Sequence, residues 1–256
     1  MKNVALKYIV IALLLSVQVQ AYGQSKADTL SYDLSFDLSG SYISGLVNRT
    51  TVVLGSDATL RKKNWAVFNK LSYRFNITNG NKLENNWYDL ASIVYYPKGR
   101  KSFYPIAFYH FESNLLYRVK RRHRFGVGAG SVIYDKNNIF LRAAAGILQE
   151  STIHNGSVFV NSSLLDAQRT NGFIAAQLNN NYSLFNDKVA LNLEGWFLKS
   201  IEEGADYDIW FIGSLDFKLT KAFSFLVRYN YRFENVYLEG LTAKNDVLLF
   251  GAKFQI

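Results

Sequence analysis

The chain has 256 residues, a formal net charge of +9, 49% hydrophobic residues and no cysteine. The lack of cysteine excludes disulfides, lipoprotein acylation and thiolate metal sites. Beyond the N-terminus no stretch approaches about 18 consecutive apolar residues, which excludes a membrane-spanning helix there.

The N-terminus has the pattern of a secretory signal peptide. Lys2 and Lys7 flank a short apolar run, Tyr8 to Val17, and small residues at cleavage spacing follow it. The run is too short to span a bilayer as a helix. Cleavage after Ala21 would also fit, but we favour a cut after Gly23. We therefore expect a signal peptide over residues 1–23 and one domain over residues 24–256.

The first predicted strand, Tyr32 to Tyr42, alternates strictly between apolar and polar residues. One face carries Tyr32, Leu34, Phe36, Leu38, Gly40 and Tyr42, and the other carries Asp33, Ser35, Asp37, Ser39 and Ser41. Ten residues at about 3.3 Å each, tilted by about 40°, cover about 25 Å, which is the height of the apolar band of a transmembrane barrel. The pattern predicts a strand with one face toward lipid and one toward water.

Further strands follow at regular intervals, and Asn79-Gly80 predicts a tight turn between the third and the fourth. The expected ranges are Asn48–Leu60, Trp65–Ile77, Asn86–Tyr96, Ser102–Tyr117, His123–Tyr134, Ile139–Gln149, Gly172–Tyr182, Lys188–Leu198, Ile209–Leu219, Phe223–Phe233 and Asp246–Ile256. The longest expected loop is the polar segment Glu150 to Asn171.

The fourth and fifth strands are apolar on both faces, so some of their large side chains must point inward. We expect these to be Ile93, Tyr104, Ile106 and Phe108. The sixth strand places Gly126, Gly128 and Gly130 on one face, which would leave room for bulky neighbours. Together these features predict a narrowed lumen.

The chain ends on an alternating strand whose apolar face carries Leu248, Phe250, Ala252, Phe254 and Ile256. Such a strand can seal a closed barrel against the first strand. Twelve strands is an even number, and the short connections fall on one side when the N-terminus lies in the periplasm. A soluble β-sandwich could also alternate, but it would not need this combination of features. The predicted fold class is all-β, an antiparallel up-and-down transmembrane barrel of about 12 strands in the bacterial outer membrane.

Three stretches resemble the putative salt-induced outer-membrane protein family. They are Ser44-Gly45 through Asn48-Arg49-Thr50, Phe125 to Gly130, and Leu141 to Glu150. The resemblance implies a barrel linked to envelope conditions. It implies no activity and provides no catalytic or binding residues.

The inward faces of the predicted strands carry charges of both signs. These residues are Asp33, Asp37, Lys70, Arg74, Arg142, Glu194, Asp216, Lys218, Arg228, Arg232 and Glu234. His110 and Glu112 share an inward face and, with Lys70, Arg74, Arg228 and Arg232, form a candidate polar network of the lumen. Ser113 lies on the opposite face from His110, so the two cannot share a proton. We expect no catalytic residues, cofactor or metal site.

A basic run precedes the glycine-rich strand and falls in an expected extracellular turn. Arg118, Lys120, Arg121 and Arg122 could contact lipid phosphates there, although a solvated turn is the alternative. The expected partners are outer-membrane lipids and, during biogenesis, the barrel assembly machinery. We expect a monomer with no nucleic-acid partner.

The sequence leaves three functions open. The first is a non-enzymatic structural or envelope-stress-related barrel with a narrow or occluded lumen. The second is a small-solute channel, and the third is an outer-membrane lipid-modifying enzyme. The doubly apolar fourth and fifth strands favour the first function, since barrels of this size can be filled by their own side chains.

Overall fold

The computed structural model describes residues 30–43, 48–97, 102–136, 138–162 and 166–256. The expected signal peptide, residues 1–23, lies outside the described residues. Within the described part of the chain, no helix is long and apolar enough to cross a membrane.

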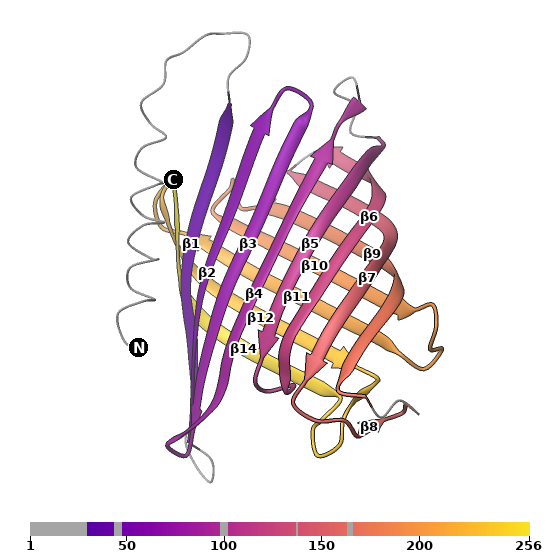
Figure 1. Cartoon of the computed structure of the whole chain (residues 1–256). Helices are drawn as coiled ribbons and strands as arrows, with labels where there is room; N and C mark the ends of the chain where they lie inside the picture. Colours follow the sequence, from indigo (N-terminus) through magenta and orange to yellow (C-terminus); the bar gives the residue numbers. More distant parts are fainter. Residues whose placement is uncertain (1–29, 44–47, 98–101, 137, 163–165) are drawn as a thin grey trace. The chain divides into compact units, whose positions relative to one another are not determined.

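Twelve antiparallel strands form a closed barrel, and two short strands pair in a separate sheet (Figure 1). The barrel strands are β1 (Ser31–Ile43), β2 (Arg49–Lys62), β3 (Trp65–Thr78), β4 (Asn81–Tyr95), β5 (Tyr104–Asn114), β6 (Val119–Lys136), β7 (Ile139–His154), β9 (Gln168–Leu184), β10 (Val189–Ser200), β11 (Tyr207–Lys218), β12 (Phe223–Glu234) and β14 (Lys244–Gln255). The short strands are β8 (Phe159–Val160) and β13 (Tyr237–Leu238). The predicted fold class and strand number are confirmed.

The first and last strands close the barrel. β1 pairs with β14 from Ser35 opposite Gln255 to Gly40 opposite Phe250. In β14 Leu248, Phe250 and Phe254 are exposed while Leu249 is fully buried. The last strand therefore presents the apolar outer face that its alternation predicted, and it closes the barrel against the first strand.

The alternation of β1 matches the wall of the barrel. Asp37 and Ser39 are buried on the lumen side, whereas Phe36 and Leu38 are exposed on the outside. Apolar side chains on an outer wall suit the hydrocarbon of a bilayer, and polar ones suit the lumen.

The two ends of the barrel differ in their connections. We call one the loop end, with connections at 44–48, 79–80, 115–118, 155–167, 201–206 and 235–243. The opposite turn end has connections at 63–64, 96–103, 137–138, 185–188 and 219–222. At Asn79-Gly80 both residues have positive φ, 49° and 80°, as the predicted tight turn requires. The two long connections, 155–167 and 235–243, lie together at the loop end.

The glycines of β6 make room for aromatic side chains of β5 inside the barrel. Gly126 lies opposite Phe108 and Gly130 opposite Tyr104 in the sheet register. A Cβ atom added at either glycine would overlap the facing ring. The predicted role of this glycine face is therefore confirmed.

Ile93 was expected to point inward, and this prediction was wrong. Its side chain is 42% exposed on the outer wall, while Val94 is 1% exposed and faces the lumen. Val94 lies opposite Ala66 of β3 and Ile106 of β5, and this pairing determines which residues of β4 face the lumen. Both faces of β4 are apolar at this end, so alternation alone could not decide between the two residues.

Several strands extend farther toward the loop end than the sequence analysis placed them. β6 begins at Val119 instead of His123, and β7 continues to His154 instead of ending at Gln149. The long loop between β7 and β9 therefore covers residues 155–167 instead of 150–171. The added strand residues carry charged side chains, which were read as loop residues because charge is uncommon in strands.

Candidate functional site: a charged cluster and a cavity in the lumen

Charged side chains from five strands meet inside the barrel near the loop end. This loop-end cluster consists of Glu112 (β5), Arg122 and Arg124 (β6), Glu150 (β7), Asp208 (β11), and Arg232 and Glu234 (β12). Arg122 and Arg124 are 4% and 1% exposed. The cluster is thus withdrawn from bulk water although every member carries an ionisable group.

Each arginine of the loop-end cluster contacts two or more carboxylates. Arg122 Nη1 lies 2.9 Å from Glu234 Oε1 and 3.2 Å from Glu112 Oε2. Arg124 donates from Nε to Glu150 at 2.6 Å and from Nη2 to Asp208 at 2.7 Å. Arg232 bridges Glu112 and Glu234. Buried charges are tolerated only when they are paired and hydrogen-bonded in this way.

The two long loops are joined beyond the loop-end cluster. β8 and β13 pair at Val160–Tyr237 and Phe159–Leu238, and Phe159, Val236 and Leu238 form a small apolar cluster. The ring of Phe159 packs edge-on against His154 at 5.0 Å between centroids. The loops are therefore packed onto the end of the barrel wall.

A second ion pair supports the same end. Arg169 of β9 donates to Asp206 at 2.6 Å, and its guanidinium lies 5.2 Å from the centroid of the Phe159 ring. Burial raises the pKa of Asp206, an effect that the charge of Arg169 opposes. The connection 201–206 is thereby linked to the loop that carries β8.

An apolar cluster fills the lumen on one side. Leu148, Phe173, Ala175 and Leu198 are its buried members. Phe108, Trp196 and Trp210 pack against it, and the rings of Phe108 and Trp196 meet edge to face at 5.7 Å. Part of the lumen is thus a packed core, as the inward position of Phe108 predicted.

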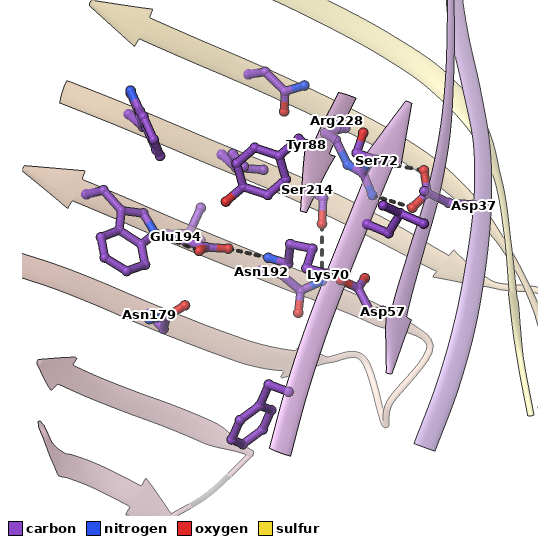
Figure 2. Close-up of a pocket in the computed structure, with 18 of the residues that line it drawn as sticks. Asp37, Asp57, Lys70, Ser72, Tyr88, Asn179, Asn192, Glu194, Ser214 and Arg228 are labelled. Carbon is purple, nitrogen blue, oxygen red and sulfur yellow. Dashed lines mark hydrogen bonds and ion pairs between the residues drawn. The ribbon is translucent and has the colours of Figure 1, made fainter. Parts of the chain in front are cut away.

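The remaining lumen holds a cavity of about 940 Å³. It extends from Glu112, Tyr117 and Arg232 beside the loop-end cluster to Arg61 and Lys63 at the turn end. Figure 2 shows side chains of β1, β2 and β3 facing those of β9 to β12 across this space. A volume of this size is within the range of small-molecule sites, about 300–1,000 Å³.

Several charged groups of the cavity wall form ion pairs across the lumen. Arg228 donates to both carboxylate oxygens of Asp37 at 3.0 Å each, a bidentate pair that is visible in Figure 2. Lys70 contacts Glu194. Lys253 Nζ lies 3.2 Å from Asp216 Oδ2. These pairs tie β12 to β1, β3 to β10 and β14 to β11.

Between the pairs the wall presents amides, hydroxyls and aromatic rings. Asn192 donates to Ser214 at 3.2 Å, and Trp196 Nε1 donates to Glu194 at 2.8 Å. The other polar and aromatic lining residues include Ser72, Tyr88, Asn86, Asn179, Asn181, Asn230 and Phe68. Such a surface can both donate and accept hydrogen bonds.

All six residues of the predicted lumen network lie on inward faces of their strands, and five of them form ion pairs. Lys70, Arg228, Arg232 and Glu112 form the pairs described above, and Arg74 Nε lies 3.9 Å from Glu84 Oε2. His110 shares their inward face, but its ring nitrogens have no hydrogen-bond partner among the described residues. It packs instead against the rings of Tyr88 and Trp210, at 4.6 and 5.4 Å. Ser113 lies on the outer face, opposite Trp87, as predicted.

The basic run divides between two environments. Arg118 lies in the connection 115–118, and Lys120 and Arg121 are exposed at the loop end. Arg122 was expected in the same turn, and this placement was wrong, since it lies within β6 and points into the loop-end cluster. Contact between the other three residues and lipid phosphates stays a prediction.

The sequence analysis missed Arg124, Glu150 and Asp208 as members of the cluster. A signal was present, because Arg122, Arg124, Gly126, Gly128 and Gly130 keep one uninterrupted period of two. Extending the glycine face backward along β6 would have placed both arginines in the lumen. Glu150 and Asp208 could be assigned to the cluster only from the residues that they pair with across the barrel. That pairing depends on the register between strands, which the sequence does not give.

A closed barrel with a polar lumen and an apolar outer wall defines the class of this protein, since only closed barrels and helices satisfy their backbone groups inside a bilayer. It is an outer-membrane β-barrel. The sequence matches the family described as "Protein of unknown function, DUF481" over residues 36–253, and the chain belongs to this family. The link to salt-induced proteins stays a prediction.

A solved structure has the same fold. The chain is similar to the NanC porin, with 11% identity and a TM-score of 0.53, over 86% of this chain and 100% of that one. It is also similar to the translocator domain of the autotransporter NalP from Neisseria meningitidis, with 12% identity and a TM-score of 0.45, over 98% of this chain and 95% of that one. No curated protein matches the sequence significantly.

Proposed function

We propose that this protein is a non-enzymatic barrel of the outer membrane whose lumen is closed at the loop end and whose cavity opens at the turn end. The loop end would face outside the cell, since long loops of such barrels are extracellular and short turns are periplasmic. The cavity would then be accessible from the periplasm. The role is structural or related to envelope stress, and it does not include general permeation.

The observation that carries this proposal is the burial of the loop-end cluster. Arg124 reaches across the lumen from β6 to Asp208 on β11 and also contacts Glu150. A solute moving past would have to separate these charges in a poorly hydrated space, which is costly. The apolar cluster around Leu148 and Phe173 fills the lumen beside it.

Bilayer conductance of the refolded protein tests the closure. We expect conductance well below that of a general porin and no swelling of proteoliposomes in disaccharides. Phe108→Gly combined with Tyr104→Gly removes two inward rings of β5 and should raise conductance if these rings contribute to the closure. Rapid disaccharide entry through the unmutated protein would refute the proposal.

A small-solute channel is the second candidate, and the cavity favours it. The closure consists of side chains and two loops, and such elements can move on the microsecond-to-second scale of channel and lid motions. A gated channel would show discrete openings in the same conductance traces. Replacement of residues 235–243, which contain β13, by a two-residue Asn-Gly turn should make such openings longer, whereas a permanently closed barrel would change little.

The absence of an enzymatic activity is also part of the proposal. Purified protein should not hydrolyse labelled phospholipid, and His110→Ala should behave like the unmutated chain, because His110 is buried in the lumen away from lipid. Turnover that depends on an intact His110 would contradict this. We further propose a monomer whose Arg118, Lys120 and Arg121 contact phosphates of outer-leaflet lipids.

A further inference from the structure

The inner end of the cavity contains polar atoms that the protein itself does not satisfy. Trp210 Nε1, Arg232 Nε, the Tyr117 hydroxyl and Asn230 Oδ1 are buried and have no hydrogen-bond partner among the described residues. All four residues line the cavity. A buried polar atom without a partner costs about 1–3 kcal/mol, so several at one place indicate a site completed by another molecule.

These four atoms come from neighbouring positions. Trp210 lies opposite Arg232, and Asn230 is two residues before Arg232 on the same face of β12. The guanidinium of Arg232 lies over the Tyr117 ring at 4.5 Å and over the Trp210 ring at 5.0 Å. Burial raises the pKa of the Tyr117 phenol, which keeps its proton available for donation. The arrangement presents two N–H donors, a hydroxyl that can donate or accept, and the Asn230 Oδ1 atom, which only accepts.

The charge of the site is already balanced by the protein. Arg232 is paired with Glu112 and Glu234, Arg228 with Asp37, and Lys70 with Glu194. An anion at the inner end would therefore meet carboxylates as well as cations. Arg61 and Arg142 lie over the ring of Phe68 toward the turn end, at 6.0 and 5.5 Å, away from the inner end.

A hydroxyl group fits the unsatisfied atoms better than a carboxylate does. A hydroxyl accepts from Trp210 Nε1 or Arg232 Nε and can donate to Asn230 Oδ1, whereas a carboxylate only accepts and would leave Asn230 unsatisfied. Along the rest of the cavity, Asn179, Asn192 and Ser214 offer further hydrogen bonds, and Trp196 offers an aromatic face (Figure 2).

We propose that the cavity binds a neutral polyhydroxylated solute of one to three sugar rings, with a hydroxyl group bound at Trp210, Asn230 and Tyr117. This inference rests on one part of the proposed function, namely that the cavity opens at the turn end and the solute enters there. The protein would then hold a sugar in its lumen without passing it across the membrane.

Titration of the refolded full-length protein with glucose, maltose and maltotriose tests the site. The detergent should have no sugar headgroup. The four tryptophans are Trp65, Trp87, Trp196 and Trp210. All except Trp65 contribute to the cavity lining, but Trp87 is 42% exposed and packs its ring against Tyr73 on the outer wall. Trp65→Phe with Trp87→Phe therefore leaves a protein whose tryptophan fluorescence reports on the cavity. We expect saturable changes in fluorescence and heat of binding with at least one neutral sugar, and weaker binding of glucuronate.

Two variants test the assigned atoms. Trp210→Phe keeps the ring and removes the donor, and Asn230→Leu removes the acceptor, so each should weaken sugar binding by about three- to tenfold. Trp65→Phe is the matched control, since Trp65 is exposed on the outer wall and does not line the cavity, and it should leave the affinity unchanged. Barrel folding is checked for each variant by gel mobility with and without heating.

The outcomes separate this inference from the proposed function. No saturable binding of any of the three sugars, tighter binding of glucuronate than of glucose, or equal affinity in Trp210→Phe and Trp65→Phe would each overturn the site. Disaccharide permeation with binding retained would overturn the closure alone. If no sugar binds and the protein does not conduct, the binding site alone would be overturned and the proposed closure would stand.

Discussion

At the scale of single residues, the glycines of β6 determine how much aromatic volume the lumen can hold. The ring of Phe108 occupies the space that a side chain at Gly126 would need, and Tyr104 does the same at Gly130. The pairs are in register across β5 and β6, so each glycine serves one ring. Small and large residues thus alternate across facing positions, as in a packed core.

We expect Gly126→Val to destabilise the barrel by about 1–3 kcal/mol, because the added side chain overlaps the Phe108 ring and forces it from its position. Urea unfolding in lipid vesicles would measure this loss. Adding Phe108→Ala should recover part of it, since the overlap disappears. If the two changes were additive, the ring would not be the cause.

Lipid contact gives a second prediction at this scale. Phe36 is exposed on the outer wall, so Phe36→Arg should lower the free energy of unfolding by about 2–4 kcal/mol. Val227→Arg should have the same effect. Ser35 is the matched control, since it is adjacent in β1 but faces the lumen beside Asp57. Equal losses at Ser35 and Phe36 would show that the assigned register is wrong.

The outcome at Ile93 and Val94 shows where single-residue prediction ends. In β1 polar and apolar residues alternate, so burial of Asp37 followed directly from the pattern. Residues 93 and 94 are both apolar and β-branched, and only the pairing of Val94 with Ala66 decides which faces inward. Register is a property of two strands, and it could not be read from one.

At the scale of elements, the structure corrected the predicted ends of several strands and left the predicted number of barrel strands unchanged. Hydrophobic alternation marks the part of a strand that meets lipid, and it is lost where the strand rises above the membrane. β6 and β7 continue past that level with Arg122, Arg124 and Glu150. The loop-end cluster lies on these continuations, which is why the fold was predicted better than the site.

The orientation of the elements can be tested with single cysteines, because the chain has none of its own. Glu239 is exposed at the loop end and Lys221 at the turn end. A membrane-impermeant maleimide should label Glu239→Cys on intact cells. It should label Lys221→Cys only after the outer membrane is opened. The reverse pattern would mean that the cavity opens to the outside.

At the scale of the whole molecule, the lumen is divided into three regions. The apolar cluster around Phe173 fills one side, the loop-end cluster lies near one end, and the cavity occupies the rest. The doubly apolar β5 allowed the filled side to be predicted. The cavity could not be predicted, since its shape depends on which inward side chains pair across the barrel, as Arg228 does with Asp37.

The loop-end cluster should contribute to stability as well as to closure. Arg124→Leu leaves Glu150 and Asp208 buried without their principal partner, and removing one side of such a pair typically costs about 3–5 kcal/mol. Lys136→Leu, in the same strand but exposed at the turn end, is the control and should change the free energy of unfolding by no more than about 0.5 kcal/mol. Urea unfolding in vesicles gives both values. Conductance of folded Arg124→Leu should also rise, because the bridge from β6 to β11 across the lumen is removed. A variant as stable and as closed as the unmutated protein would show that the closure depends on the loops and not on the buried charges.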